Sequence, residues 1–179
     1  MELVEKTLNS NLKFEGKILK LKVDRVQLPD GSVSSREIVC HNGGACVLPI
    51  SADGKVALVK QFRYPYKEVI YEIPAGKIDQ GESPKQTAVR ELFEEVGGKS
   101  NNFVDLGIIY PTPGYTNEKI YVYIALDTIY EQPSLDEGEF LDVEFFEFNK
   151  VLEMIEDNTI KDSKTIISVL RAKINNNIK

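Results

Sequence analysis

The chain is poor in the residues that build disulfide, zinc and membrane-spanning structures. It has no tryptophan, one histidine and two cysteines among 179 residues. Cys40 and Cys46 are too few for a disulfide framework and lack zinc-site spacing, so we expect two buried thiols in a reducing, cytoplasmic compartment. No apolar run reaches the length of a membrane span, and the opening MELVEKTLNS lacks the apolar core of a signal peptide. We therefore expect neither a disulfide-stapled domain nor a membrane partner.

Positive charge is also scarce, with 22 Lys and Arg against 28 Asp and Glu and a net charge of −6. This balance argues against a broad nucleic-acid-binding surface. It does not exclude a nucleotide ligand, because a bound metal can reverse the local field. The composition is typical of a globular protein, and the length suffices for one substantial core but not for two ordinary domains.

Hydrophobic alternation predicts strands in the first forty residues. Leu19, Leu21 and Val23 alternate with charged residues, which is the period of a half-buried strand. The turn-forming residues 28–31 follow, and residues 35–39 return as a partner strand. Such a hairpin is too small to stand alone. We expect a β-hairpin subdomain over 1–40, packed on the main domain (41–179) or on another subunit.

The main domain shows several strand-like runs and few helices. Strands are expected at 45–50, 56–62, 68–73, 104–110, 119–126 and 143–148. Two closing helices are expected, one capped by Asn149 and running to about Glu156, the other beginning near Asp162. This order favours an α/β or α+β fold layered around a mixed sheet.

A further helix is predicted within the glycine-flanked segment 76–98. Ser83 suits the N-cap and Pro84 the first helical position, while Gln86 completes a capping box with Ser83. Gly97 and Gly98 supply the stop. These signals predict a helix over 84–96.

Winding this helix at about 100° per residue separates its acidic and apolar residues. Glu91, Glu94 and Glu95 share one arc, where like charges are unfavourable unless a cation lies among them. Mg²⁺ prefers such oxygen ligands, and Arg90 can pair with Glu82. The alternative is a solvated, acidic surface helix. The expected core face comprises Ala88, Val89, Leu92, Phe93 and Val96.

The segment closely resembles the Nudix box. Gly76, five residues, Glu82, seven residues and then RELFEEVG reproduce the pattern of that family, except that Gly98 stands where an aliphatic residue is usual. The resemblance implies an α/β/α sandwich around a mixed sheet. It also implies that a nucleoside diphosphate linked to another moiety is hydrolysed with Mg²⁺, for which Mn²⁺ can substitute.

The same resemblance assigns roles within the box. Glu91 and Glu95 would be metal ligands, and the backbone carbonyl of Ala75 would be a further ligand. Glu94 would be a third carboxylate ligand or a catalytic group. Arg90 and Glu82 would orient the others.

Sequences outside the box resemble the ADP-ribose pyrophosphatase branch of the family, and the likeness spans roughly residues 14–172. The matching runs are QFRYP (61–65), EIPAGKID (72–79), YPTPGYTNE (110–118) and LDEGEF (135–140). Pro113 stands sixteen residues after Gly97, as in that branch. This implies hydrolysis of ADP-ribose to AMP and ribose 5-phosphate. The alternatives are another nucleoside diphosphate sugar or dinucleotide as substrate, or a non-catalytic ADP-ribose-binding regulator.

The branch also suggests residues for the remaining roles. Glu139, with Glu137 as its alternative, would activate the attacking water or complete the metal site. Arg63 and Arg36 would bind phosphate or stack on adenine, and Glu118 would contact the ribose. Because the chain has no tryptophan, any stacking on adenine must use Tyr, Phe or Arg. Related enzymes commonly exchange the N-terminal hairpin across a homodimer. We therefore expect a homodimer with a small nucleoside diphosphate substrate.

Overall fold

The computed structural model describes residues 2–135 and 138–175. The chain forms two compact units, Met1–Gly43 with Tyr110–Lys119, and Gly44–Ile109 with Ile120–Lys179. The segment 110–119 packs with the N-terminal residues in the first of these units.

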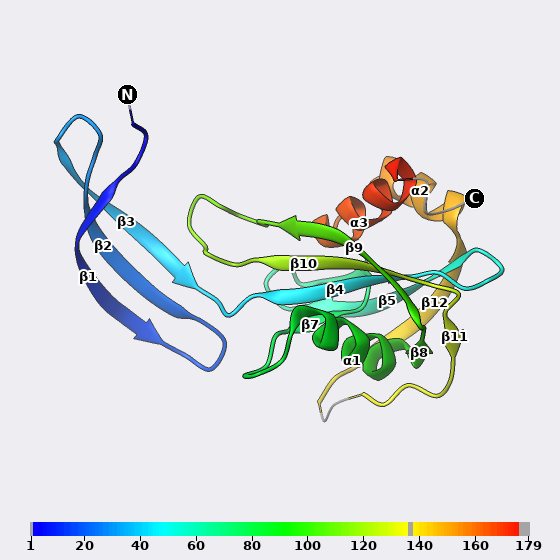
Figure 1. The fold of residues 1–179 in the computed structure, drawn as a ribbon. Helices are drawn as coiled ribbons and strands as arrows, with labels where there is room; N and C mark the ends of the chain where they lie inside the picture. Colours follow the sequence, from blue (N-terminus) through cyan, green and yellow to red (C-terminus); the bar gives the residue numbers. More distant parts are fainter. Residues whose placement is uncertain (1, 136–137, 176–179) are drawn as a thin grey trace. The chain divides into compact units, whose positions relative to one another are not determined.

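The first unit is built on a three-stranded antiparallel sheet (Figure 1). Its strands are β1 (Lys6–Glu15), β2 (Lys20–Gln27) and β3 (Val33–Cys40). The expected pairing of the second and third strands is confirmed, with Leu21 opposite Val39. No separate strand was predicted for β1, whose residues do not alternate regularly between apolar and polar. All ten of its residues are exposed, the apolar ones included. Apolar side chains in this unit are consequently left open to solvent.

The second unit contains a mixed sheet in the order β7-β4-β10-β9, in which β10 is parallel to β4 and the other pairs are antiparallel. These strands are β4 (Gly44–Pro49), β7 (Ala75–Lys77), β9 (Asn102–Ile109) and β10 (Ile120–Leu126). An antiparallel sheet in the order β12-β5-β6 comprises β5 (Lys55–Arg63), β6 (Glu68–Glu72) and β12 (Leu141–Glu147). Two short strands, β8 (Gly98–Lys99) and β11 (Ile129–Tyr130), form a separate pair.

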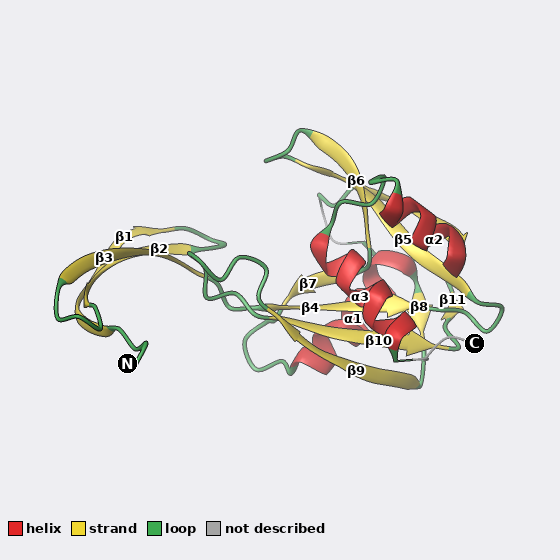
Figure 2. Cartoon of the chain, turned by 90° about the horizontal axis from the view of Figure 1, so that it is seen from above, coloured by secondary structure: helices red, strands yellow, loops and turns green. Residues whose placement is uncertain are grey.

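Helices cover both faces of the mixed sheet, with α1 on one side and α2 and α3 on the other (Figures 1 and 2). Their bounds are α1 (Pro84–Val96), α2 (Phe148–Glu156) and α3 (Ser163–Ile174). Alternate residues of β4 serve the two layers. Ala45 and Val47 join the cluster under α1, and Cys46 and Leu48 join the cluster under α2 and α3. The expected α/β/α sandwich around a mixed sheet is confirmed.

The two cysteines are free, and they differ in exposure. Cys46 is fully buried, and burial raises the pKa of its thiol to about 12, which makes it inert. Cys40 is only partly buried, so the prediction of two buried thiols is wrong for it. Cys40 ends β3 in the open sheet of the first unit, where no helix layer covers it in the described residues.

The caps of the two closing helices differ from each other. Asp162 caps α3 as expected, and its side chain accepts a hydrogen bond from the Thr165 amide. Asn149 was expected to cap α2, but it lies inside the helix, whose N-cap is Glu147 without a side-chain cap bond. The helix instead begins directly after β12, and its Val151 and Met154 are buried in the core. Among the residues that the structure describes, no helix has the length and apolarity needed to cross a membrane.

Candidate active site

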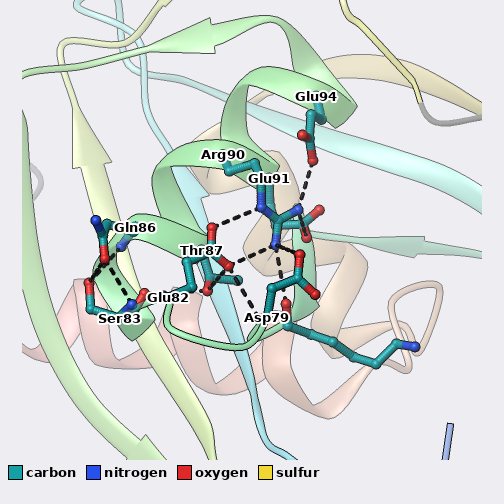
Figure 3. Close-up of polar contacts among 9 residues, drawn as sticks. Asp79, Glu82, Ser83, Gln86, Thr87, Arg90, Glu91 and Glu94 are labelled. Carbon is teal, nitrogen blue, oxygen red and sulfur yellow. Dashed lines mark hydrogen bonds and ion pairs between the residues drawn. The ribbon is translucent and has the colours of Figure 1, made fainter.

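The predicted helix over 84–96 is confirmed as α1, including its caps. Gln86 donates its amide to the Ser83 hydroxyl at 3.3 Å, and the Ser83 amide donates to Gln86 Oε1 at 2.9 Å (Figure 3). Gly97 adopts the left-handed conformation at φ 65°, which ends the helix. The side chain of Leu92 occupies the space that a side chain at position 98 would need, and its Cδ1 lies 2.6 Å from the place of a Cβ on Gly98. Local chemistry therefore fixes both ends of the acidic segment.

The apolar face of α1 is narrower than predicted. Ala88, Leu92 and Val96 are buried against the sheet, as expected. Val89 is 44% exposed, so its assignment to the core is wrong. It lies with Phe93 at an open surface hollow beside β8 and β9, beyond the edge of the packed layer.

Two of the three glutamates are buried rather than solvated. Glu91 is 8% exposed and Glu95 is 5% exposed. Helix winding explains this, because Glu95 points only about 20° away from Ala88. The Ala75 amide donates a hydrogen bond to Glu95 Oε2 at 3.2 Å. The acidic arc therefore turns two carboxylates toward β7.

Burial without enough counter-charge governs the titration of this pair. Burial, followed by the negative charge of Glu91, raises the pKa of Glu95 to about 8. Burial also raises the pKa of Glu91, although Arg90 acts in the opposite direction. The charge of Glu139 contributes to both shifts, which brings this exposed loop residue within electrostatic reach of the pair. A cation between the two carboxylates would relieve this energetic cost.

Gly76 gives Glu91 the space that it occupies. A Cβ on residue 76 would lie 1.7 Å from Glu91 Oε1, far inside any real contact. The carboxylate therefore packs directly on the backbone of β7. No residue with a side chain can stand here without displacing Glu91.

Arg90 connects three of the predicted glutamates, Glu82, Glu91 and Glu94 (Figure 3). Its Nε and Nη2 donate to the two oxygens of Glu82 at 3.0 and 3.1 Å, which confirms the expected bidentate pair. Nη1 donates to Glu91 at 2.6 Å and to Glu94 at 2.8 Å. The Arg90 guanidinium lowers the pKa of Glu82 to about 2, and the Thr87 hydroxyl helps by donating to Glu82 at 2.7 Å. Arg90 thus fixes the rotamers of three carboxylates.

The donor atoms fit a hard divalent cation. Glu91, Glu95 and the backbone of Ala75 are brought together, and carboxylate and carbonyl oxygens are what Mg²⁺ prefers. Within residues 2–135 and 138–175, no three His, Cys, Asp or Glu side chains are clustered for metal binding. A set of two carboxylates and one carbonyl does not require such a cluster. Arg90 donates to Glu91 as well as to Glu94, so a cation at Glu91 would share that carboxylate with Arg90.

Arg63 lies at the end of β5 and is anchored by a residue that the sequence prediction missed. Its Nε and Nη2 donate to Glu72 at 2.5 and 2.7 Å, and Glu72 is only 1% exposed. One edge of the guanidinium is therefore committed to Glu72. Glu72 stands within the EIPAG run, but nothing in that run shows that its carboxylate is buried.

The other predicted substrate residues belong to the first unit. Arg36 Nη2 donates to Glu5 at 2.5 Å. Glu118 lies 3.3 Å from His41 Nδ1, and Pro113 is exposed in the turn that follows Thr112. Their relation to the acidic helix stays a prediction. Glu137, the alternative to Glu139, lies outside the described residues.

Comparison with known proteins gives matches over nearly the whole chain. Residues 41–167 match the NUDIX domain, and residues 5–39 match the nucleoside diphosphate sugar hydrolase N-terminal domain. The chain is 40% identical to an ADP-ribose pyrophosphatase of Bacillus subtilis, with 93% of this chain and 91% of the relative covered. It is 41% identical to a methanol dehydrogenase activator of Bacillus methanolicus, with coverage of 92% and 90%.

A solved structure has the same fold. The crystal structure of an ADP compounds hydrolase superposes with a TM-score of 0.85 at 22% identity, and covers 95% of this chain and 92% of its own. The domain match spans the acidic helix, Gly76 and Arg90 together. The chain belongs to the Nudix family.

Proposed function

We propose that this protein hydrolyses the pyrophosphate bond of ADP-ribose to give AMP and ribose 5-phosphate, using Mg²⁺ or, in its place, Mn²⁺. The observation that carries the proposal is the pair of buried, undercompensated carboxylates of Glu91 and Glu95 beside β7. The identity of the substrate is supported by the 40% identical ADP-ribose pyrophosphatase, which covers nearly the whole chain.

The proposed chemistry requires that the negative charge of the pyrophosphate be neutralised. A pyrophosphate is anionic and repels hydroxide, and a bound divalent cation neutralises that charge and lowers the pKa of water. Glu91, Glu95 and the Ala75 carbonyl would hold the cation. Arg90 and Glu82 would hold the glutamates in place. Arg90 donates to both Glu82 and Glu91, and these hydrogen bonds keep the two carboxylates from turning toward solvent.

The remaining residues receive proposed roles around the substrate. Glu139 would accept a proton from the attacking water, since it is exposed and its charge reaches the buried pair. Glu94 would serve as an additional acid or ligand once it leaves Arg90. For the substrate itself we propose contacts from Arg63, Arg36, Glu118 and Pro113.

A substrate panel tests the proposal and its nearest rival, another nucleoside diphosphate sugar or dinucleotide. We expect Mg²⁺-dependent AMP release that is fastest with ADP-ribose, and slower turnover of a GDP-sugar and of NAD. Excess EDTA should abolish it. Faster turnover of the GDP-sugar or of NAD would contradict the substrate assignment, and turnover that persists in EDTA would contradict the metal requirement.

A non-catalytic ADP-ribose-binding regulator is the alternative from another functional class. The retention of Glu82, Glu91, Glu94 and Glu95 in one connected arrangement favours an enzyme. The same assay separates the two, because a regulator would bind ADP-ribose in calorimetry and release no AMP with any divalent cation.

We further propose a cytoplasmic homodimer built through the first unit. Leu8, Leu12 and Phe14 of β1 are about half exposed, at 47%, 51% and 57%. A strand that leaves such apolar area open suits burial against a second copy. Light scattering at micromolar concentration should give a dimeric mass, and Leu12→Lys with Phe14→Lys should give a monomeric one. A monomeric mass for the unaltered protein would refute the dimer.

A further inference from the structure

Arg63 is the last of four charged side chains that form a row and alternate in sign. Arg63 donates to both oxygens of Glu72, and Lys164 Nζ also donates to Glu72 Oε2. Lys164 Nζ donates in addition to Asp162 Oδ1 at 2.9 Å. The row therefore runs Asp162, Lys164, Glu72, Arg63, from the start of α3 through β6 to the end of β5. Its formal charges sum to zero.

The negative end of the row rests on the N-terminus of α3. Asp162 Oδ2 accepts hydrogen bonds from the Thr165 amide at 2.9 Å and from the Thr165 hydroxyl at 2.6 Å. An anion is favoured at this end of a helix. Thr165 Oγ1 also accepts the Ile73 amide at 2.9 Å, which ties α3 to the residue after Glu72. This contact fixes the position of Lys164 relative to the Glu72 carboxylate.

The positive end of the row is the accessible one. The side chain of Arg63 is 40% exposed, whereas those of Glu72, Lys164 and Asp162 are 1%, 12% and 13% exposed. Burial opposes the ionisation of Glu72, but Arg63 and Lys164 outweigh it and lower the pKa of Glu72. Burial likewise opposes the charge of Lys164, and its two acidic partners raise the pKa of Lys164 above the ordinary value. Glu72 and Lys164 are therefore both charged at neutral pH, as is Arg63.

Lys164 changes what Glu72 does to Arg63. If Glu72 bonded to Arg63 alone, its carboxylate would cancel most of the positive charge of the guanidinium. Because Lys164 shares the same carboxylate, Glu72 is already compensated and Arg63 keeps a net positive field. Arg63 is linked to the acidic helix through the backbone, because Glu72, which binds it, stands three residues before Ala75, whose amide donates to Glu95 Oε2 at 3.2 Å.

We propose that Lys164 is a positioning residue for the binding of the anionic diphosphate, which compensates Glu72 and so keeps Arg63 fixed and net positive, and that Asp162 is the counter-charge of Lys164 and limits this effect. The inference rests on the proposed function, which supplies the anionic substrate. It assigns a role in substrate affinity to two residues at the start of α3, far along the chain from the box.

The test compares steady-state kinetics of ADP-ribose hydrolysis in variants that change one charge each. Lys164→Gln should raise KM about tenfold, which corresponds to roughly 1.4 kcal/mol of binding, with kcat changed less than about twofold. Lys164→Arg retains the charge and should keep KM within about threefold of the starting value. Lys150→Gln, which removes an exposed lysine paired with Glu153 on α2, is the matched control and should leave both constants unchanged.

Asp162→Asn separates electrostatic positioning from simple support of the helix. Asparagine also caps helices well, so α3 should remain capped. Removing the negative charge should strengthen the field at Arg63 and lower KM about twofold, opposite to Lys164→Gln. If Asp162→Asn instead raises KM, the inference is overturned, whether or not Lys164→Gln folds.

The remaining outcomes separate the inference from the proposed function. A folded Lys164→Gln protein with unchanged KM, or with a loss confined to kcat, overturns the inference while leaving the proposed function intact. Absence of ADP-ribose turnover in the unaltered protein would overturn the proposed function instead. Calorimetry of ADP-ribose binding in EDTA gives a second readout. Lys164→Gln should weaken this binding by the same factor by which it raises KM.

Discussion

Glu95→Gln is expected to lower kcat for ADP-ribose by about 10²- to 10³-fold, the size of effect seen when one charge-stabilising group is removed from an active site. The glutamine oxygen can still accept the Ala75 amide, so the local hydrogen bond is retained. What is lost is one negative charge beside Glu91, where a divalent cation would bind. AMP release at saturating ADP-ribose and Mg²⁺ measures the effect.

Loss of activity in this variant should not be accompanied by loss of stability. The pKa of Glu95 is raised to about 8 in the folded protein, from an ordinary value of 4.5. Between these values the folded protein holds a proton that the unfolded chain has released, so this group makes stability fall as pH rises. Without metal, Glu95→Gln should therefore raise the melting temperature more at pH 8 than at pH 5. Near-full activity of the variant on every substrate would show that the metal assignment is wrong.

Gly76→Ala is expected to lower kcat about 10²-fold, because a displacement of about 1 Å at a reacting centre has consequences of this size. The new methyl group would occupy the place of Glu91 Oε1, at 1.7 Å. Backbone pairing of Gly76 with Ala45 keeps β7 in place, so the carboxylate must move instead.

Gly54→Ala is the matched control for this change. Gly54 has φ 85° in the turn between β4 and β5, and a Cβ there would contact nothing within 4 Å. An alanine at this positive φ is strained, so Gly54→Ala should lower the melting temperature and leave kcat unaltered. If Gly76→Ala lowers the melting temperature to the same extent and kcat remains at the level of the control, the crowding argument fails.

Local signals account for what the sequence predicts well. Ser83, Pro84, Gln86 and Gly97 define α1 without help from the rest of the chain, and helical spacing brings Arg90 to Glu94. The pairing of β2 with β3 follows from alternation and a recognisable turn. These features depend on residues within a few positions of one another.

Burial depends on distant segments, and the sequence predicts it less well. Glu91 and Glu95 were expected on an acidic face, yet the sheet edge at β7 closes over them. Val89 was expected in the core, yet no strand of the described structure extends far enough to cover it. The row that ends at Arg63 joins residues up to 101 positions apart, from Arg63 to Lys164, and no local pattern indicates it.

The central claim is that Glu91 and Glu95 hold a divalent cation on α1, and the most direct test is Mn²⁺ binding followed by electron paramagnetic resonance. We expect the unaltered protein to remove free Mn²⁺ from solution and to release it when Mg²⁺ is added. Glu95→Gln should weaken Mn²⁺ binding at least about tenfold. Equal affinity of the two proteins for Mn²⁺ would contradict the account.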